Sequence, residues 1–272
     1  MAESVEEIRN RVRTSYEGYH DLVASVEQML QDGKKAAASR APNADEHVVV
    51  LASGGLDSSV MMHWVIDKYK CRIHPLFFRR GARAEKLEEK AFDFFVDYYK
   101  SKFPDNMGEA AKLDYEVPPI QFKKDFPPEL SATIGHPMRN STMQNLAVMY
   151  AVALNGKHDL KIRTILSGST GDDLGEPEQG LLSLRAQTFS TCVQMGGWGW
   201  NITSPFIDSG FLAEPVYKKH LIEYAMQNFI PLDKTRTCFG SDELACGECF
   251  ACMKRLKAFE SLGYQDPAGY KK

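Results

Sequence analysis

Long apolar runs are absent from this chain of 272 residues. A membrane-spanning helix needs about 20 consecutive apolar residues, and no segment approaches that length. The stretch from Met1 to Glu7 is acidic and lacks the apolar region of a secretory signal. We therefore expect a cytoplasmic protein with no membrane partner. The length suffices for one large α/β domain or for a domain with an appendage.

An excess of positive charge is also missing. The chain has 33 lysines and arginines against 36 aspartates and glutamates, which gives a net charge of −3. Binding to a nucleic-acid backbone needs a basic surface. We therefore do not expect nucleic acid as a partner, although a local basic patch stays open.

Two common phosphate-binding motifs are missing as well. The sequence has neither G-x-x-x-x-G-K-[ST] nor G-x-G-x-x-G at the end of an apolar run. It has instead S-G-G-L-D-S-S at residues 53–59, between the apolar run 47–52 and a segment of helical period from Val60 to Ile66. This order predicts a buried strand, a tight glycine turn and a helix start.

The stretch 53–59 has the chemistry of an anion site. A helix start offers unpaired N–H groups and the positive end of the helix dipole. Gly54 and Gly55 let the backbone approach an anion, and the serines add hydroxyl donors. Asp57 is suited either to cap the helix or to orient a metal–phosphate group. The alternative is a plain glycine turn capped by Asp57 and Ser58.

Strands and helices alternate along the rest of the chain. We expect strands at 47–52, 71–78, 114–117, 163–168 and 201–206, and helices at 1–33, 85–103, 140–156, 180–195 and 214–229. Residues 34–45 look like a linker, and 120–137 like a loop. The alternation predicts an α/β fold with a mostly parallel sheet covered on both faces. The loops 53–59, 79–83, 168–179 and 206–218 would then meet at the carboxyl edge of the sheet, where ligands bind.

Four of the six cysteines crowd into the last 35 residues, as Cys238, Cys246, Cys249 and Cys252. In a reducing compartment this spacing favours a metal over disulfides. Four thiolates suit a structural tetrahedral Zn²⁺ with no open position. An iron–sulfur cluster and a redox pair at 249 and 252 are the alternatives. Nearby cations would offset the thiolate charge: Lys254, Arg255 and Lys257. The other two cysteines, Cys71 and Cys192, are expected to be buried small apolar residues.

These motifs together resemble a known family. S-G-G-L-D-S-S after a strand resembles the pyrophosphate loop of the ATP pyrophosphatase (PP-loop) enzymes. T-R-T-C at 235–238 with the remaining cysteines, P-M-R-N-S at 137–141, S-P-F-I-D at 204–208 and K-A-F at 257–259 look like the QueC family of 7-cyano-7-deazaguanine synthases. The resemblance covers roughly residues 47–267.

The resemblance implies a Rossmann-like PP-loop fold, bound Zn²⁺ and a homodimer. It also implies ATP and Mg²⁺ as cofactors and a deazapurine as the small-molecule substrate. In that family ATP adenylates the carboxylate of 7-carboxy-7-deazaguanine, ammonia gives the amide, and a second ATP drives dehydration to the nitrile. Three segments follow: a helical extension at 1–45, the PP-loop domain at 46–235 and a zinc-binding segment at 236–272.

The resemblance also assigns residues. Asp57, Ser58, Arg139 and Lys218 are the expected catalytic residues. The expected nucleotide-binding residues are Ser53, Gly54, Gly55, Asp57, Ser58, Ser59, Phe78, Asn140 and Gly168. Two of these residues have an alternative without a catalytic role. Arg139 could be a surface cation at a helix start, and Lys218 could be part of a solvated face with Lys219.

Two loops depart from the family pattern. The family has D-Y-G-Q-R-H where this chain has Arg79 to Ala84, and D-Y-S-G-Y-P-D-C where it has Asp173 to Gln179. The loss of both tyrosines removes a stacking surface for a flat base, and Arg79 reverses a charge at the expected edge of the site. The leading 45 residues are also foreign to the family. Activation by ATP thus looks retained, while the substrate or the nucleophile has room to differ.

Four functions therefore compete. The first is a synthase that uses ammonia. The second is a diverged ligase that joins the activated deazaguanine to an amine of a protein acceptor, as in anti-phage operons. The third is a PP-loop enzyme acting on tRNA, which would require a catalytic cysteine pair or a basic RNA-binding domain. The fourth is an inactive zinc scaffold, which the intact loop at 53–59 disfavours.

Overall fold

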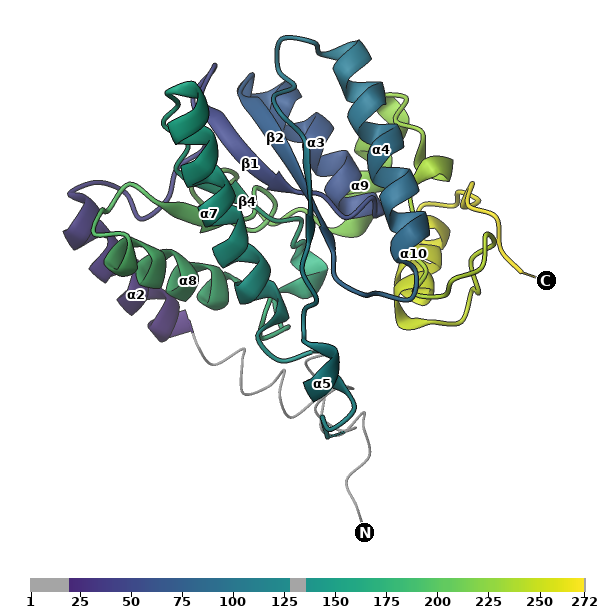
Figure 1. The fold of residues 1–272 in the computed structure, drawn as a ribbon. Helices are drawn as coiled ribbons and strands as arrows, with labels where there is room; N and C mark the ends of the chain where they lie inside the picture. The colour runs from purple at the N-terminus through teal and green to yellow at the C-terminus, as the bar shows by residue number, and fades with distance from the viewer. Residues whose placement is uncertain (1–19, 128–135, 272) are drawn as a thin grey trace.

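A five-stranded parallel sheet forms the centre of the protein (Figure 1). The computed structural model describes residues 20–127 and 136–271. The strands are β1 (His47–Leu51), β2 (Arg72–Arg79), β3 (Ala111–Asp114), β4 (Thr164–Leu166) and β5 (Asn201–Thr203). They lie in the order β3-β2-β1-β4-β5, and each neighbouring pair is parallel. The predicted α/β class is confirmed.

The central strand β1 is buried on both faces, which explains why its sequence is apolar without alternation. Val48 and Val50 point into one buried layer, and Val49 points into the other. All three side chains are at most 1% exposed. A parallel sheet covered on both faces requires such continuous apolar strands.

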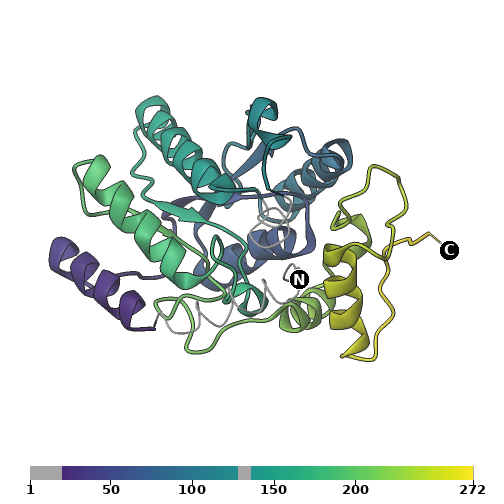
Figure 2. The same cartoon turned by 90° about the horizontal axis from the view of Figure 1, so that it is seen from below.

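Helices cover both faces of the sheet (Figures 1 and 2). One layer contains α3 (Leu56–Tyr69), α4 (Glu85–Lys102) and α9 (Lys218–Gln227), and the other contains α7 (Arg139–His158) and α8 (Leu181–Gln194). The predicted helices that begin at 85, 140, 180 and 214 all exist. Their ends differ from the prediction by one to four residues, because local pattern fixes the existence of a helix better than its bounds.

Two predictions along the chain were wrong in detail. The third strand lies at Ala111–Asp114 rather than 114–117, because β3 pairs with the end of β2 and Asp114 already lies opposite Arg79, the last residue of that strand. In the expected loop 120–137, Ile120–Lys123 form the short helix α5. This helix and the start of α7 lie at the carboxyl edge of the sheet (Figure 1).

The N-terminal extension packs on the core. Its described helix is α2 (His20–Lys34), which ends where the sequence predicts and lies beside α8 (Figure 2). Leu30 is fully buried in that contact. The predicted helix at 1–19 lies outside the described residues. The predicted linker is also partly buried, at Ala38 and Ser39.

A buried charge network ties this extension to the segment after β5. The guanidinium of Arg185, on α8, binds both oxygens of Asp208 at 2.8 Å and Glu27 of α2 at 2.8 Å. Ser39 Oγ donates to Asp208 at 2.6 Å. Burial acts to raise the pKa of Asp208, but the hydrogen bonds from Arg185 outweigh it and lower that pKa. The extension is therefore bonded to the core through charged groups as well as apolar contacts.

The C-terminal segment contains η2 (Leu232–Lys234) and α10 (Phe250–Glu260). Arg255 of α10 is 1% exposed and binds Asp266 at 2.7 and 2.9 Å and Thr235 Oγ1 at 2.6 Å. These bonds hold the chain on both sides of the cysteines. Among the described residues no helix is long and apolar enough to cross a membrane.

Candidate active site

The stretch 53–59 lies at the point where the strand order reverses. It leaves the carboxyl end of β1, and Gly168 follows the carboxyl end of the neighbouring strand β4. From β1 the chain moves outward to β2 and β3, and later to β4 and β5 on the other side. In open α/β sheets this switch point leaves a crevice for ligands. The predicted loops therefore meet at one edge.

Gly54 has no room for a side chain. Its φ is +71°, and a Cβ there would lie 2.4 Å from the carbonyl oxygen of Glu88 and 2.9 Å from the nitrogen of Phe92. The loop is thus pressed against the backbone of α4. Across the crevice, a Cβ on Gly168 would lie 3.4 Å from the nitrogen of Ser58. Both glycines keep backbone close to backbone around the predicted anion site.

The helix start behind the loop is left without a side-chain cap. Gly55 is the N-cap of α3 and no side chain accepts a hydrogen bond there, so of the two roles considered for Asp57 the structure does not show the helix cap. Ser58 Oγ lies 3.1 Å from the nitrogen of Ser53 and 3.2 Å from its Oγ, which closes the loop on itself. An uncapped helix start with hydroxyls beside it suits an anion.

Ser59 differs from the other serines. It is fully buried, and its Oγ has no hydrogen-bond partner. Its carbonyl oxygen accepts a bond from Tyr99 at 3.0 Å. The structure therefore exposes Ser53, buries Ser58 with its Oγ against Ser53, and leaves the Ser59 hydroxyl beneath the loop.

Asp57 meets Lys218, which comes from a segment 161 residues later. Lys218 Nζ contacts both carboxylate oxygens of Asp57. Lys218 is 8% exposed whereas Lys219 is exposed, so the solvated-face alternative for Lys218 was wrong. Burial raises the pKa of Asp57, the Lys218 ammonium opposes that, and the nearby charge of Asp173 raises it further.

The segment after β4 positions this lysine. Lys218 is the first residue of α9, and its backbone N–H donates to Asp172 Oδ2 at 2.7 Å. Asp172 belongs to η1 (Gly171–Asp173), where Thr170 and Asp173 cap each other. The loop that departs from the family pattern is therefore joined to the start of α9 beside Asp57.

Arg139 and Asn140 begin α7 at the same edge. Arg139 is half-buried and donates from Nε to Asn140 Oδ1 at 3.2 Å, so it is not a free surface cation. Burial lowers the pKa of Arg139, and the charge of Arg80 lowers it further. Asn140 Nδ2 lies 3.5 Å from the carbonyl oxygen of Glu178.

Glu178 was missed by the sequence reasoning. Both of its carboxylate oxygens are buried without a hydrogen bond of good geometry. Burial raises its pKa, while the Arg139 charge and the first backbone N–H groups of α7 lower it. A glutamate in a loop gives no sequence signal for such a position, because the contact depends on how 178 and 139 come together.

Arg79 does not place an unpaired positive charge at the edge of the site, as was expected from its replacement of the family's aspartate. Arg79 binds Glu89 of α4 at 2.7 and 3.0 Å and Asp114 of β3 at 3.2 Å, so its charge is neutralised by carboxylates of these two elements. The neighbouring Arg80 is the one whose charge reaches Arg139, and it binds Glu88 at 3.0 and 3.2 Å. Phe78, the residue before Arg79, is 7% exposed, and its side chain packs in the apolar core.

The four cysteines of the C-terminal segment bring their sulfur atoms close together. All four sulfur atoms lie within 4.8 Å of one another, with Cys238 and Cys246 Sγ 3.6 Å apart. Tetrahedral zinc with Zn–S bonds near 2.3 Å places its sulfurs roughly 3.8 Å apart, so the donor set fits. Backbone N–H groups point at the sulfurs, and the N–H of Cys249 lowers the pKa of Cys246 to about 6. The cluster could hold a metal, as predicted. The other cysteines, Cys71 and Cys192, are buried and unpaired.

The C-terminal segment 236–272, called here the cysteine segment, directly contacts the loop at residues 53–59, called here the glycine loop. The backbone N–H of Arg236 donates to the carbonyl oxygen of Gly54 at 2.8 Å. The guanidinium of Arg236 turns the other way and binds the carbonyl oxygens of Gly240 at 2.5 Å and Glu243 at 3.0 Å. Of the predicted countercations, Arg255 is paired with Asp266 and Lys254 with Asp173. The segment therefore braces the loop as well as carrying the cysteines.

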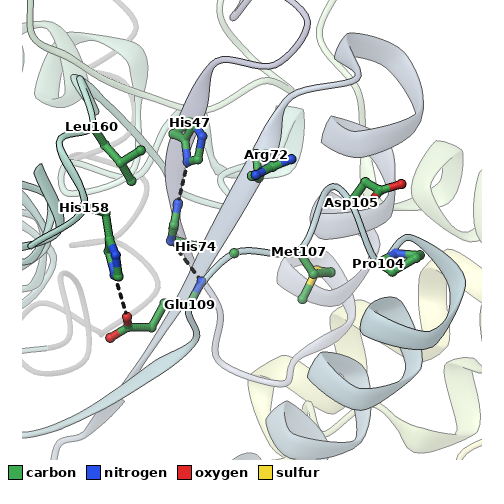
Figure 3. A pocket seen from close by; sticks show the side chains of 10 residues that line it. His47, Arg72, His74, Pro104, Asp105, Met107, Glu109, His158 and Leu160 are labelled. Carbon is green, nitrogen blue, oxygen red and sulfur yellow. Dashed lines mark hydrogen bonds and ion pairs between the residues drawn. The ribbon is translucent and has the colours of Figure 1, made fainter.

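A separate cavity opens at the opposite edge of the sheet, where β1 and β2 begin (Figure 3). His47 and His74 are joined at 2.9 Å, and the N–H of Glu109 donates to the other ring nitrogen of His74 at 3.1 Å. Burial lowers the pKa of His74 to about 4. The loops described above lie at the other edge, so this cavity is not the candidate active site.

Comparison with known proteins agrees with this geometry. The family model described as "Queuosine biosynthesis protein QueC" matches residues 47–263. The chain belongs to the QueC family. A 7-cyano-7-deazaguanine synthase of Thermoplasma acidophilum is 29% identical over 82% of this chain and 92% of the relative. A synthase of the same name from Acetivibrio thermocellus is 30% identical over 82% and 96%.

QueC relatives are enzymes, and membership makes this chain a PP-loop enzyme whose family uses ATP to convert a deazaguanine carboxylate to a nitrile. Two solved structures are more distant. A 4-thiouridine synthetase–RNA complex with bound ATP matches with a TM-score of 0.42 and 15% identity, over 79% of this chain and 54% of the other. The U34-tRNA thiolase NcsA of Methanococcus maripaludis gives 0.40 and 11%, over 88% and 71%.

Proposed function

We propose that this protein adenylates the carboxylate of 7-carboxy-7-deazaguanine, or of a close analogue, for attack by a nitrogen nucleophile. With ammonia the product is the amide and then the nitrile. The observation that carries the proposal is the contact of Lys218 with Asp57 beside a loop in which Gly54 has no room for a side chain. Such a site holds a phosphate chain at a helix start.

In this reaction the loop residues and Lys218 have separate roles. A substrate carboxylate oxygen attacks the α-phosphorus, the α–β bond breaks, and pyrophosphate leaves with the electron pair. The amides of the loop 54–58 and the hydroxyls of Ser53 and Ser58 bind the leaving pyrophosphate. Lys218 offsets the negative charge that develops there, which is the main contribution in phosphate-displacement chemistry.

Asp57 is the residue suited to Mg²⁺. Its carboxylate is the ligand type that this ion takes, and it lies beside the loop. When bound, Mg²⁺ supplies charge neutralisation on the phosphates. In its absence the Lys218 ammonium balances the Asp57 carboxylate. Zn²⁺ would be held by Cys238, Cys246, Cys249 and Cys252, and four thiolates leave it a structural role.

Arg139 is suited to bind the substrate carboxylate. It lies at the edge of the crevice with Asn140, and its planar guanidinium matches a carboxylate in a two-point contact. Its lowered pKa reflects a partly dry setting in which such a contact is stronger. After adenylation the same residue offsets charge on the acyl oxygen.

The test is incubation with ATP, Mg²⁺ and 7-carboxy-7-deazaguanine, with and without ammonium. Pyrophosphate release together with a mass shift to the amide or nitrile supports the proposal. A purine that causes no pyrophosphate release under any condition contradicts it. An Asp57→Ala variant serves as the inactive control.

A second candidate keeps the activation step and changes the acceptor. The segment at the carboxyl edge exposes large apolar side chains, with Ile120 63%, Phe122 59% and Met138 69% exposed. Exposed apolar groups beside a site suit a macromolecular partner. The amine would then belong to an acceptor protein, as expected from the altered loops. Adenylate that forms without ammonia and is consumed only when a protein is added would favour this reading.

A further inference from the structure

A lysine from the cysteine segment reaches the crevice. Lys254 lies on α10, two residues after Cys252, and its Nζ is 3.4 Å from Asp173 Oδ1. Its Nζ also lies 4.7 Å from the ring centre of Phe250. The side chain is 26% exposed, so it is held inward rather than extended into solvent. The expected role of offsetting the thiolates does not explain this direction.

Asp173 does not depend on Lys254 for its position. Its Oδ2 accepts from the N–H and the Oγ1 of Thr170, both at 3.0 Å, as part of the cap of η1. The contact with Lys254 is a single one of 3.4 Å, longer than the two bonds from Thr170. Two of the three ammonium hydrogens have no partner among the described residues. The ammonium is therefore available to a further ligand.

The carboxylate of Asp173 links Lys254 to Asp57 of the glycine loop. Asp173 is close enough to Asp57 for its charge to raise the pKa of Asp57, and Asp172 does the same. The edge thus gathers three carboxylates, which repel a phosphate chain, around the buried cation Lys218. A second lysine would balance the negative charge that ATP brings.

We propose that Lys254 is a second phosphate-binding lysine, which contacts the pyrophosphate part of ATP. The inference rests on the proposed function only in requiring ATP at the loop. The Arg236 N–H bond to Gly54 supports it independently, because it fixes the cysteine segment against the same loop. Lys254 and Lys218 would then approach the leaving pyrophosphate from two different helices.

The test measures binding, without the purine substrate. Affinities of Lys254→Met and the wild type are compared by calorimetry for α,β-methylene ATP with Mg²⁺, pyrophosphate with Mg²⁺, and AMP. We expect Lys254→Met to weaken the first two about tenfold and to leave AMP unchanged, since one charge-assisted contact is lost. Lys254→Arg should keep part of the affinity.

The matched control is Lys257→Met, on the same helix. Lys257 is exposed and has no ion pair among residues 20–127 and 136–271, so its removal should change neither affinity. Zinc content and thermal midpoint are measured for each variant. Pyrophosphate affinity of Lys254→Met within twofold of the wild type would overturn the inference, and so would an equal loss for AMP.

The outcomes also separate this inference from the proposed function. A wild type that binds neither ATP nor pyrophosphate overturns both. A wild type that binds them but does not act on the purine overturns the substrate assignment alone. In that case the Lys254 comparison still decides the inference.

Discussion

Asp57 and Lys218 show how much of the site depends on single contacts. Lys218 is buried and Asp57 is partly exposed, with side chains 10% and 29% exposed, and in the described part of the chain neither side chain has a second ion-pair partner. Removing one leaves an uncompensated charge in a partly dry crevice. The effects should therefore exceed those of surface charges.

Lys218→Met should lower the rate of pyrophosphate release at least a hundredfold, because the cation opposite the leaving group is lost. Lys219→Met is the neighbouring control, exposed to solvent, and should keep the wild-type rate. The measurement is pyrophosphate release at saturating ATP on variants with matched thermal midpoints. A Lys218→Met enzyme with more than a tenth of the wild-type rate would contradict the assigned role.

Gly54→Ala should abolish ATP binding. The added Cβ would meet the Glu88 carbonyl oxygen at 2.4 Å, and the positive φ disfavours alanine. Gly156→Ala is the control, because that glycine lies in α7 with nothing within 4 Å, and there alanine should stabilise the fold by about 0.5–1 kcal/mol. Calorimetry with an ATP analogue and urea unfolding report the two effects. An alanine tolerated at 54 would show that the loop moves freely from α4.

The sequence predicted those parts of the site that lie in one continuous stretch. The glycine loop and its strand–turn–helix setting follow from local pattern, and the cysteines follow from spacing. Asp57 and Lys218 were assigned to the site through the family resemblance, and their contact with each other was not predicted. Glu178 and Arg80 were missed, because their positions depend on contacts between distant segments.

At the scale of elements, α2 and the cysteine segment are both built into the core by buried arginines. Arg185 joins α2 to the chain after β5, and Arg255 joins α10 to the tail. The sequence predicted both segments but not their attachment, since an arginine in a helical pattern reads as exposed. The short helix α5 was missed because four residues give too little periodicity.

Arg185→Met should lower the free energy of unfolding by about 3–5 kcal/mol, since Asp208 is left buried and unpaired. Arg40→Met removes the exposed pair with Glu46, whose side chains are 60% and 36% exposed, and should cost less than about 1 kcal/mol. Urea titration of both variants provides the comparison. Equal losses would mean that the buried network does not stabilise the extension.

Removal of the metal proposed for the four cysteines, by a chelator, should weaken ATP binding as well as lower the thermal midpoint. The cysteines hold the segment that begins at Arg236, and the N–H of that residue fixes Gly54. Binding of an ATP analogue is measured before and after removal and again after zinc is restored. Unchanged affinity in protein shown to lack metal would disprove this coupling.

At the scale of the whole molecule, two buried histidines on opposite sides of β2 make the fold sensitive to acid. His63 is enclosed by Tyr224 and Tyr99, and His74 lies at the cavity of Figure 3. Burial is the largest cause that lowers the pKa of each to about 4, followed for His63 by the Lys102 charge. An unfolded histidine has a pKa near 6.5.

Between about pH 6.5 and 4 the unfolded chain binds more protons than the folded one. The free energy of unfolding should therefore fall as the pH drops, by about 1–2 kcal/mol per histidine at pH 5. His63→Phe should reduce the difference between pH 7 and pH 5 in urea midpoint. A His63→Phe difference equal to that of the wild type would refute the assignment.

The bond from Arg236 to Gly54 also has a consequence for synthesis of the chain. The sheet is complete once β5 (Asn201–Thr203) has left the ribosome, but the loop at 54 lacks its brace until residue 236 has followed. A nascent or prematurely ended chain would thus have the nucleotide fold without a held loop. We therefore expect a chain that ends before Arg236 to bind ATP more weakly than the full chain.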